Sequence, residues 1–89
     1  MKRIRVEITE QDLLDGVACS PENCPVSRYL KKKFKVKVRT QIRTVSWWVD
    51  RNDIKTLHFY KLSKNLIKFV DDYDYGREAK PGTYYIEKV

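Results

Sequence analysis

The chain has 89 residues, which is enough for one domain with a single core and too few for a second folding unit. Its 42% hydrophobic and 12% aromatic content is typical of a folded globular protein and excludes a disordered one. The sequence contains no run of about 18 apolar residues that would predict a membrane helix. Residues 1–5 lead into a strand pattern, not an apolar signal segment. The formal charge of +7 favours acidic partners, nucleic acid among them.

The first third of the chain predicts one strand followed by two helices. Residues 2–9 alternate between apolar and polar side chains, which indicates a strand with one buried face. Thr9 then starts a short helix that ends at Gly16, because Thr-x-x-Asp is a helix-start pattern and glycine a common stop. After a loop, Pro25 suits the first position of a second helix, which we expect to run to about Lys33.

The segment 28–48 carries eight basic residues and no acidic one. Residues 34–39 alternate strictly, so we expect a strand with Phe34 inside and a row of cations outside. Such a row repeats every 6 to 7 Å or so, close to the phosphate spacing of a nucleic acid. If the first strand lies near this strand, Arg3 and Arg5 share its outer face. The predicted nucleic-acid-binding residues are Arg3, Arg5, Lys35, Lys37, Arg39, Arg43 and Trp48.

Two further strands follow the basic one. Residues 42–49 and 54–61 are rich in β-branched and aromatic side chains and flank a polar turn at residues 50–53. Three strands joined this tightly predict an antiparallel meander. Trp47 and Trp48 are adjacent, so they point to opposite faces of their strand, and we expect one to be buried and the other exposed.

The last third of the chain predicts a helix and a closing strand. Ser63 is a suitable N-cap for a helix to about Tyr73, and Gly76 stops it. Residues 83–89 form a final strand that we expect to pair near the first. Residues 1–89 are therefore predicted to be a single α+β domain of order β-α-α-β-β-β-α-β. Its mainly antiparallel sheet of about five strands has helices on one face.

Few residues of this chain could carry out chemistry. Cys19 and Cys24 leave three alternatives, which are structural thiols, a disulfide, or a zinc site that would need two more ligands; we favour structural thiols. His58 is the single histidine, and because it alternates with Leu57 and Phe59 we expect it on the sheet surface. No catalytic order or phosphate-binding loop is present, so we expect no enzyme and no cofactor.

Carboxylates gather at the end of the last helix, where the helix dipole disfavours negative charge. With Glu78 they could hold a divalent cation, but the chain lacks the glycine-interrupted loop of a calcium site. We favour pairing with basic residues of this or another molecule, and we expect no metal site. As an alternative function, exposed aromatics and this acidic end would bind a protein. The residues of that alternative are Trp47, Tyr60, Asp71, Asp72, Asp74 and Tyr75.

The order of several short motifs resembles that of small phage and prophage proteins of uncharacterised function. The motifs are Asp15-Gly16 after the short helix, Cys24-Pro25-Val26 with Leu30 downstream, and residues 72–76 (Asp-Tyr-Asp-Tyr-Gly) with Pro81 before the closing strand. The basic run 31–43 departs from that pattern. The resemblance implies a small α+β fold and a viral or mobile-element origin, and it carries no activity. We expect the protein in the cytoplasm of a host cell.

Two functions follow from these patterns. The first is an accessory protein whose basic sheet face binds nucleic acid or a nucleoprotein complex. The second is a protein-binding inhibitor of a host factor, such as a defence system. A third possibility is that the cationic face has no ligand and only keeps the protein soluble. The oligomeric state does not follow from the sequence.

Overall fold

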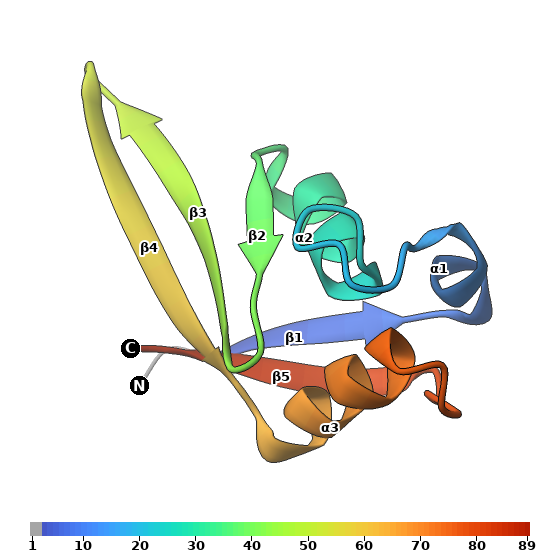
Figure 1. Ribbon diagram of the computed structural model, residues 1–89. Coiled ribbons are helices and arrows are strands. Elements are labelled where there is room, and N and C mark those ends of the chain that lie inside the picture. The colour runs from blue at the N-terminus through green and yellow to red at the C-terminus, as the bar shows by residue number, and fades with distance from the viewer. Residues whose placement is uncertain (1–2) are drawn as a thin grey trace.

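The computed structural model describes residues 3–89, which form one five-stranded antiparallel sheet and three helices (Figure 1). In chain order the elements are β1 (Arg3–Ile8), α1 (Glu10–Asp15), α2 (Pro25–Phe34), β2 (Val38–Thr40), β3 (Thr44–Arg51), β4 (Ile54–Leu62), α3 (Lys64–Asp74) and β5 (Gly82–Lys88). The predicted α+β class and the predicted order of elements are confirmed. Lys2, the predicted first residue of the opening strand, lies outside the described residues.

The strand order across the sheet is β1-β5-β4-β3-β2, with every neighbouring pair antiparallel. The closing strand pairs with β1 along its whole length, from Arg3 opposite Glu87 to Ile8 opposite Gly82, as predicted. However, β1 and β2 stand at opposite edges of the sheet. The condition that the first strand lies near the basic strand is therefore not met, because β5 and the β3–β4 hairpin separate the two.

The β3–β4 hairpin extends away from the rest of the molecule (Figure 1). β4 pairs with β3 over residues 54–61 but with β5 only over residues 60–62. We call the part beyond the β5 contact, residues 46–59, the hairpin arm. At its tip Asn52 and Asp53 have φ angles of 52° and 65°. Two central residues with positive φ are typical of a type I′ turn, whose twist matches that of the flanking strands.

The first and last helices begin at the predicted caps. Thr9 Oγ1 accepts a hydrogen bond from the Asp12 backbone N–H at 3.2 Å, and the Thr9 N–H donates back to the Asp12 carboxylate at 2.8 Å. Ser63 Oγ accepts from the Leu66 N–H at 3.3 Å in the same way. The cap at Thr9 is reciprocal and the cap at Ser63 is a single hydrogen bond. Both satisfy backbone N–H groups that have no partner at a helix start, so these short polar motifs determine where the two helices begin.

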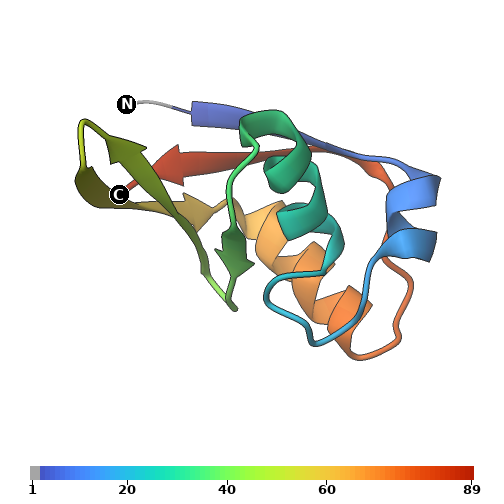
Figure 2. The same cartoon turned by 90° about the horizontal axis from the view of Figure 1, so that it is seen from above.

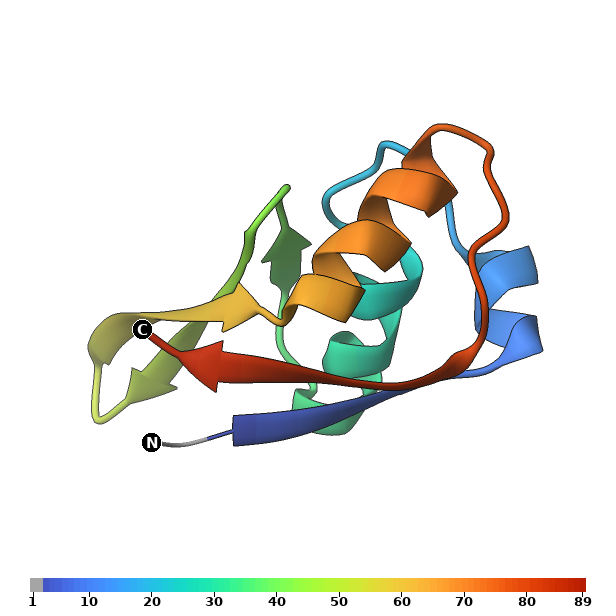
Figure 3. The same cartoon turned by 90° about the horizontal axis from the view of Figure 1, so that it is seen from below.

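One face of the sheet packs against α2 and α3, which lie on the same side of β1 and β5 in Figures 2 and 3. The buried apolar side chains of sheet and helices form a single cluster. Its members include Val6, Ile8, Val26, Leu30, Val38, Val45, Leu62, Leu66, Phe69 and Ile86. The alternate residues of the strands form the opposite face, which we call the outer face. All of them are exposed or half-buried, so helices cover only one face, as predicted.

The predicted basic strand over residues 34–39 is wrong for its first four residues. Helix α2 continues through Phe34, and Lys35 closes it in the left-handed conformation, with φ of 55°. The Lys35 N–H donates to the Lys31 carbonyl at 2.7 Å, which completes the helix end. Strand structure begins only at Val38, so β2 has three residues.

The reason for the longer helix is tertiary packing. Phe34 falls four residues after Leu30 on the inner stripe of α2, and its ring stacks on that of Trp47 with a centroid distance of 5.2 Å. The alternating pattern fitted a strand equally well, but a strand would remove this contact. As a result Lys35 and Lys37 do not share a strand face with Arg39.

Candidate nucleic-acid interface and the groove beside it

Two large aromatic side chains stand on the outer face of neighbouring strands. Trp48 of β3 lies opposite Leu57, and Phe59 of β4 lies opposite Ser46, so the two rings are diagonal neighbours across the hairpin. Their exposed fractions are 56% for Trp48 and 47% for Phe59. The buried member of the tryptophan pair is Trp47, at 5%. The prediction of one buried and one exposed tryptophan is confirmed.

Cations surround these rings on the same face. Arg39 of β2 lies in a cross-strand row with Ser46 and Phe59, and Lys61 follows Phe59 on β4. The full set of charged side chains on the outer face has five cations, Arg3, Arg5, Arg39, Lys55 and Lys61, and three carboxylates, Glu7, Asp50 and Glu87. The face is therefore positive, and less strongly so than a continuous basic strand would be.

Several of these charges already have partners. The Arg5 Nε lies 3.2 Å from Glu7 Oε1 in an exposed ion pair, and the Arg3 guanidinium lies 4.3 Å above the ring of Tyr85. Exposed pairs of this kind hold a side chain weakly, since their contribution is at most about 1 kcal/mol. Both arginines can therefore turn towards an incoming anion.

The predicted nucleic-acid residues divide into two groups. Arg3, Arg5, Arg39 and Trp48 share the outer face, whereas Lys35 and Lys37 lie in the loop after α2 and Arg43 in the turn before β3. All three of the latter are exposed. The structure brings Arg43 next to the end of β4, because its carbonyl accepts the Leu62 N–H at 2.9 Å.

Sequence reasoning missed Phe59 and placed His58 wrongly. Leu57 and Phe59 are the more apolar members of β4, which suggested that they face inwards. The structure turns them outwards and places His58 and Tyr60 on the inner face, in line with Leu62 and opposite the inner residues of β3. Leu62 could have revealed this. It is the last residue of β4 and is apolar, and because residues two apart share a strand face, a buried Leu62 places Tyr60 and His58 on the inner face.

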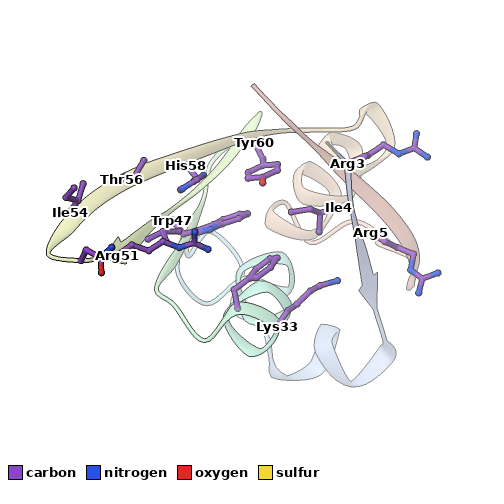
Figure 4. A pocket seen from close by; sticks show the side chains of 13 residues that line it. Arg3, Ile4, Arg5, Lys33, Trp47, Arg51, Ile54, Thr56, His58 and Tyr60 are labelled. Atoms are coloured by element: carbon purple, nitrogen blue, oxygen red, sulfur yellow. The ribbon is translucent and has the colours of Figure 1, made fainter. Parts of the chain in front are cut away.

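A groove lies on the inner side of the hairpin arm, between the arm, the start of β1 and the end of α2 (Figure 4). Its volume is about 880 Å³. At its base Trp47 stacks between Phe34 at 5.2 Å and Tyr60 at 4.7 Å between ring centroids. Ile4 points into the groove, whereas the side chains of Arg3 and Arg5 point away from it (Figure 4).

The walls of this groove are cationic. Lys33 from the end of α2 and Arg51 from the arm line it, and among the described residues no acidic side chain does. His58 is half-buried there, and its Nδ1 lies 3.1 Å from Lys88 Nζ. Because an ammonium group can only donate, His58 Nδ1 accepts this hydrogen bond.

The residues of the protein-binding alternative are mostly engaged within the chain. Trp47 and Tyr60 are only 5% and 3% exposed, so the expectation that Tyr60 is exposed is wrong. The two rings stack in the core, as described above. Tyr75, by contrast, is 73% exposed at the end of α3.

The acidic helix end is neutralised mainly by this chain's own cations. Asp72 accepts from Lys68 Nζ at 2.6 Å and from Arg77 Nε at 2.9 Å, and Arg77 also pairs with Asp71. The hydrogen bonds from Lys68 and then Arg77 lower the pKa of the Asp72 carboxyl. Asp74 accepts the Cys19 N–H at 2.9 Å. These partners explain why carboxylates sit at a helix end whose dipole disfavours them.

The two cysteines are separate thiols, with Cys24 buried at the N-cap of α2 and Cys19 exposed. The disulfide alternative therefore does not describe this structure. Within residues 3–89, no three histidine, cysteine or acidic side chains gather closely enough to hold a metal ion. No helix in that part of the chain is long and apolar enough to span a membrane.

The fold and its surfaces define an α+β protein with one helix-free sheet face and one cationic groove. Comparisons with protein-family models, with curated proteins and with solved structures find no match to this chain. The function proposed below therefore rests on the residues of this chain.

Proposed function

We propose that the outer face binds single-stranded nucleic acid, with bases stacked on Trp48 and Phe59 and phosphates held by the surrounding cations. The observation that carries the proposal is the exposure of these two rings on adjacent strands of a sheet face without covering helices. Aromatic side chains on an open sheet are a general platform for unstacked bases, because every base has a π-face.

The arrangement of charges supports the same ligand. Cations lie on two sides of Phe59. Arg39 of β2 is in the same cross-strand row as Phe59, two strands away, and Lys61 is two residues after Phe59 on the same face of β4. Arg3 lies in the row of Lys61, beyond Glu87. A strand of nucleic acid that crosses the rings can thus place phosphates near cations on either side. Such contacts read the backbone and not the base edges, so the proposal includes little sequence preference.

The experiment is a fluorescence-anisotropy titration with labelled single- and double-stranded oligonucleotides at two salt concentrations. Loss of one stacking ring costs about 1–3 kcal/mol, so Trp48→Ala should weaken binding of the single strand roughly 5- to 150-fold. Tyr75→Ala is the matched control, since it removes a 73% exposed ring away from the outer face. Equal affinity of both variants and the wild type would contradict the proposal.

Charge reversals identify which cations take part. We expect Arg39→Glu to reduce affinity and to flatten its salt dependence, because each lost phosphate contact lowers the salt slope by about 0.7 for a single strand. The double variant Lys35→Glu/Lys37→Glu changes twice the charge outside the sheet face. If it weakens binding more than Arg39→Glu does, the interface follows the loop after α2 and not the outer face.

The resemblance to phage and prophage proteins implies a setting inside a host cell, and the basic face favours a nucleoprotein complex as the partner there. The alternative is an inhibitor that binds a host protein directly. A pull-down from host lysate with and without nuclease separates the two. A partner that is retained after nuclease treatment favours the inhibitor, and one that is lost favours the nucleic-acid-binding protein.

A further inference from the structure

Along the hairpin arm, the edge of β4 on the β5 side has backbone groups without a partner strand among the described residues. Strand β4 extends over residues 54–62, but β5 pairs only with residues 60–62, and the Val89 N–H adds one hydrogen bond to the Phe59 carbonyl at 3.2 Å. Residues 54–58 of β4 therefore pair with β3 on one side, and within residues 3–89 no strand pairs with them on the other.

The backbone groups on this open edge can be identified. The Leu62 N–H points towards β3, where it donates to the Arg43 carbonyl, and the Phe59 carbonyl points towards β5. Directions alternate along a strand, so odd-numbered residues of β4 present N–H and C=O to the β5 side. Lys55 and Leu57 thus offer two donors and two acceptors to another strand, which is the usual template for strand addition.

The groove beside this edge selects the charge of a partner. Its cations are Lys33 and Arg51, Lys88 lies beside His58 at one end, and no described acidic side chain lines it. A second copy of this chain would bring its own Lys33, Arg51 and Lys88 to the same edge and would place cations near cations. An acidic segment instead meets opposite charge at Arg51 and Lys33 and, at one end of the groove, at Lys88.

We propose that the free edge of β4 binds an extended acidic peptide segment of a partner protein as an added antiparallel strand. Residues of the peptide that point to the groove lie beside Thr56, His58 and Lys88 and are acidic. Residues that point to the outer face lie beside Leu57 and the aliphatic stem of Lys55 and are aliphatic, as cross-strand neighbours on one face prefer. This inference does not rest on nucleic-acid binding.

The probe is a labelled, end-capped peptide, Val-Glu-Val-Glu-Val-Glu-Val, titrated by anisotropy at low salt. In an antiparallel pair the peptide residues that share a face with Lys55 and Leu57 also point their N–H groups at β4. N-methylation of the valines should therefore weaken binding at least tenfold or so, whereas N-methylation of the glutamates should not. Slower amide hydrogen exchange at Lys55 and Leu57 in the complex supports the same geometry.

Protein variants test the charge selection. Arg51→Glu should weaken the peptide about tenfold or more, and Lys64→Glu, an equal charge change on exposed α3, should not. A peptide with lysine in place of glutamate should not bind. The proposal is overturned if the unmodified peptide does not bind at about 1 mM, if both methylated peptides bind alike, or if the two charge reversals have equal effects. Trp48→Ala should leave peptide binding unchanged, although it should weaken oligonucleotide binding.

Discussion

The adjacent tryptophans give the sharpest test of the strand register, because they differ by one position and face opposite sides. Trp47 is 5% exposed and stacks on both Phe34 and Tyr60. Truncation of a buried aromatic residue to alanine costs about 3–5 kcal/mol, part of which is the two stacked pairs at about 0.5–1.5 kcal/mol each. A chain of 89 residues has a free energy of unfolding of roughly 4–13 kcal/mol. Trp47→Ala should therefore remove about a quarter or more of the stability.

Trp48→Ala should have a much smaller effect on stability. Its side chain is 56% exposed, and its main neighbour on the outer face is Leu57 across the strand pair. Cross-strand pairs contribute about 0.2–1 kcal/mol, and most exposed substitutions change stability by about 0.5 kcal/mol. The expected contrast between the two variants is thus at least about 2 kcal/mol.

The measurement is urea unfolding followed by far-ultraviolet circular dichroism, since both variants change the tryptophan fluorescence. With a slope of about 1–2 kcal/mol per molar urea, Trp47→Ala should lower the midpoint by roughly 1.5–5 M. Trp48→Ala should shift it by less than about 1 M. The reverse order would mean that the β3 register is displaced by one residue. The outer face described above would then be the buried one.

Three further substitutions test local features. Gly16→Ala should destabilise the fold by about 1–3 kcal/mol in thermal melts, because the added methyl group would lie 2.8 Å from Pro25 Cδ. A melting temperature equal to that of the wild type would show that Pro25 can move away from the added methyl group without cost. Asp53→Gly should raise stability by roughly 0.5–1 kcal/mol, since glycine adopts its φ of 65° without strain, and a drop in urea midpoint would argue against the type I′ turn. The lowered pKa of Asp72 stabilises the folded state above the ordinary carboxyl pKa of 3.8, and this contribution is lost as the pH falls through the lower folded value. Asp72→Asn should be less stable than the wild type at neutral pH, and the difference should shrink below about pH 4; a gap that does not depend on pH would exclude the ion pair with Lys68 as its cause.

The sequence predicted the class and order of elements because its local signals are strong. The cap at Thr9, the proline at the start of α2 and the polar turn of the hairpin each act over a few residues, and the structure retains all three. The division between Trp47 and Trp48 followed from strand geometry alone. These features need no knowledge of what packs against them.

The failures lie where two patterns competed and a distant residue decided. Phe34 fits a helix stripe and a strand alternation equally well, and its contact with Trp47 favours the helix. The inner face of β4 was likewise decided by a distant residue. Tyr60 pairs with the buried Val45 of β3, so Tyr60 and His58 face inwards although Phe59 is more apolar. These errors also changed the predicted nucleic-acid site. Phe59 and Lys61 were not included in it, and Lys35 and Lys37 were predicted in a strand, whereas they lie in the loop after α2.

The position of β5 has a consequence for the order in which the protein assembles. This strand lies between β1 and β4, so the β1 ladder joins residue 3 to residue 87. While the chain is being synthesised, residues 82–88 emerge after every other element, and until then β1 has no neighbour in the sheet. The hairpin and α2 can form early from local contacts, whereas closure of the sheet waits for long-range pairing, which is slow. The first strand to be made is thus among the last to be fixed.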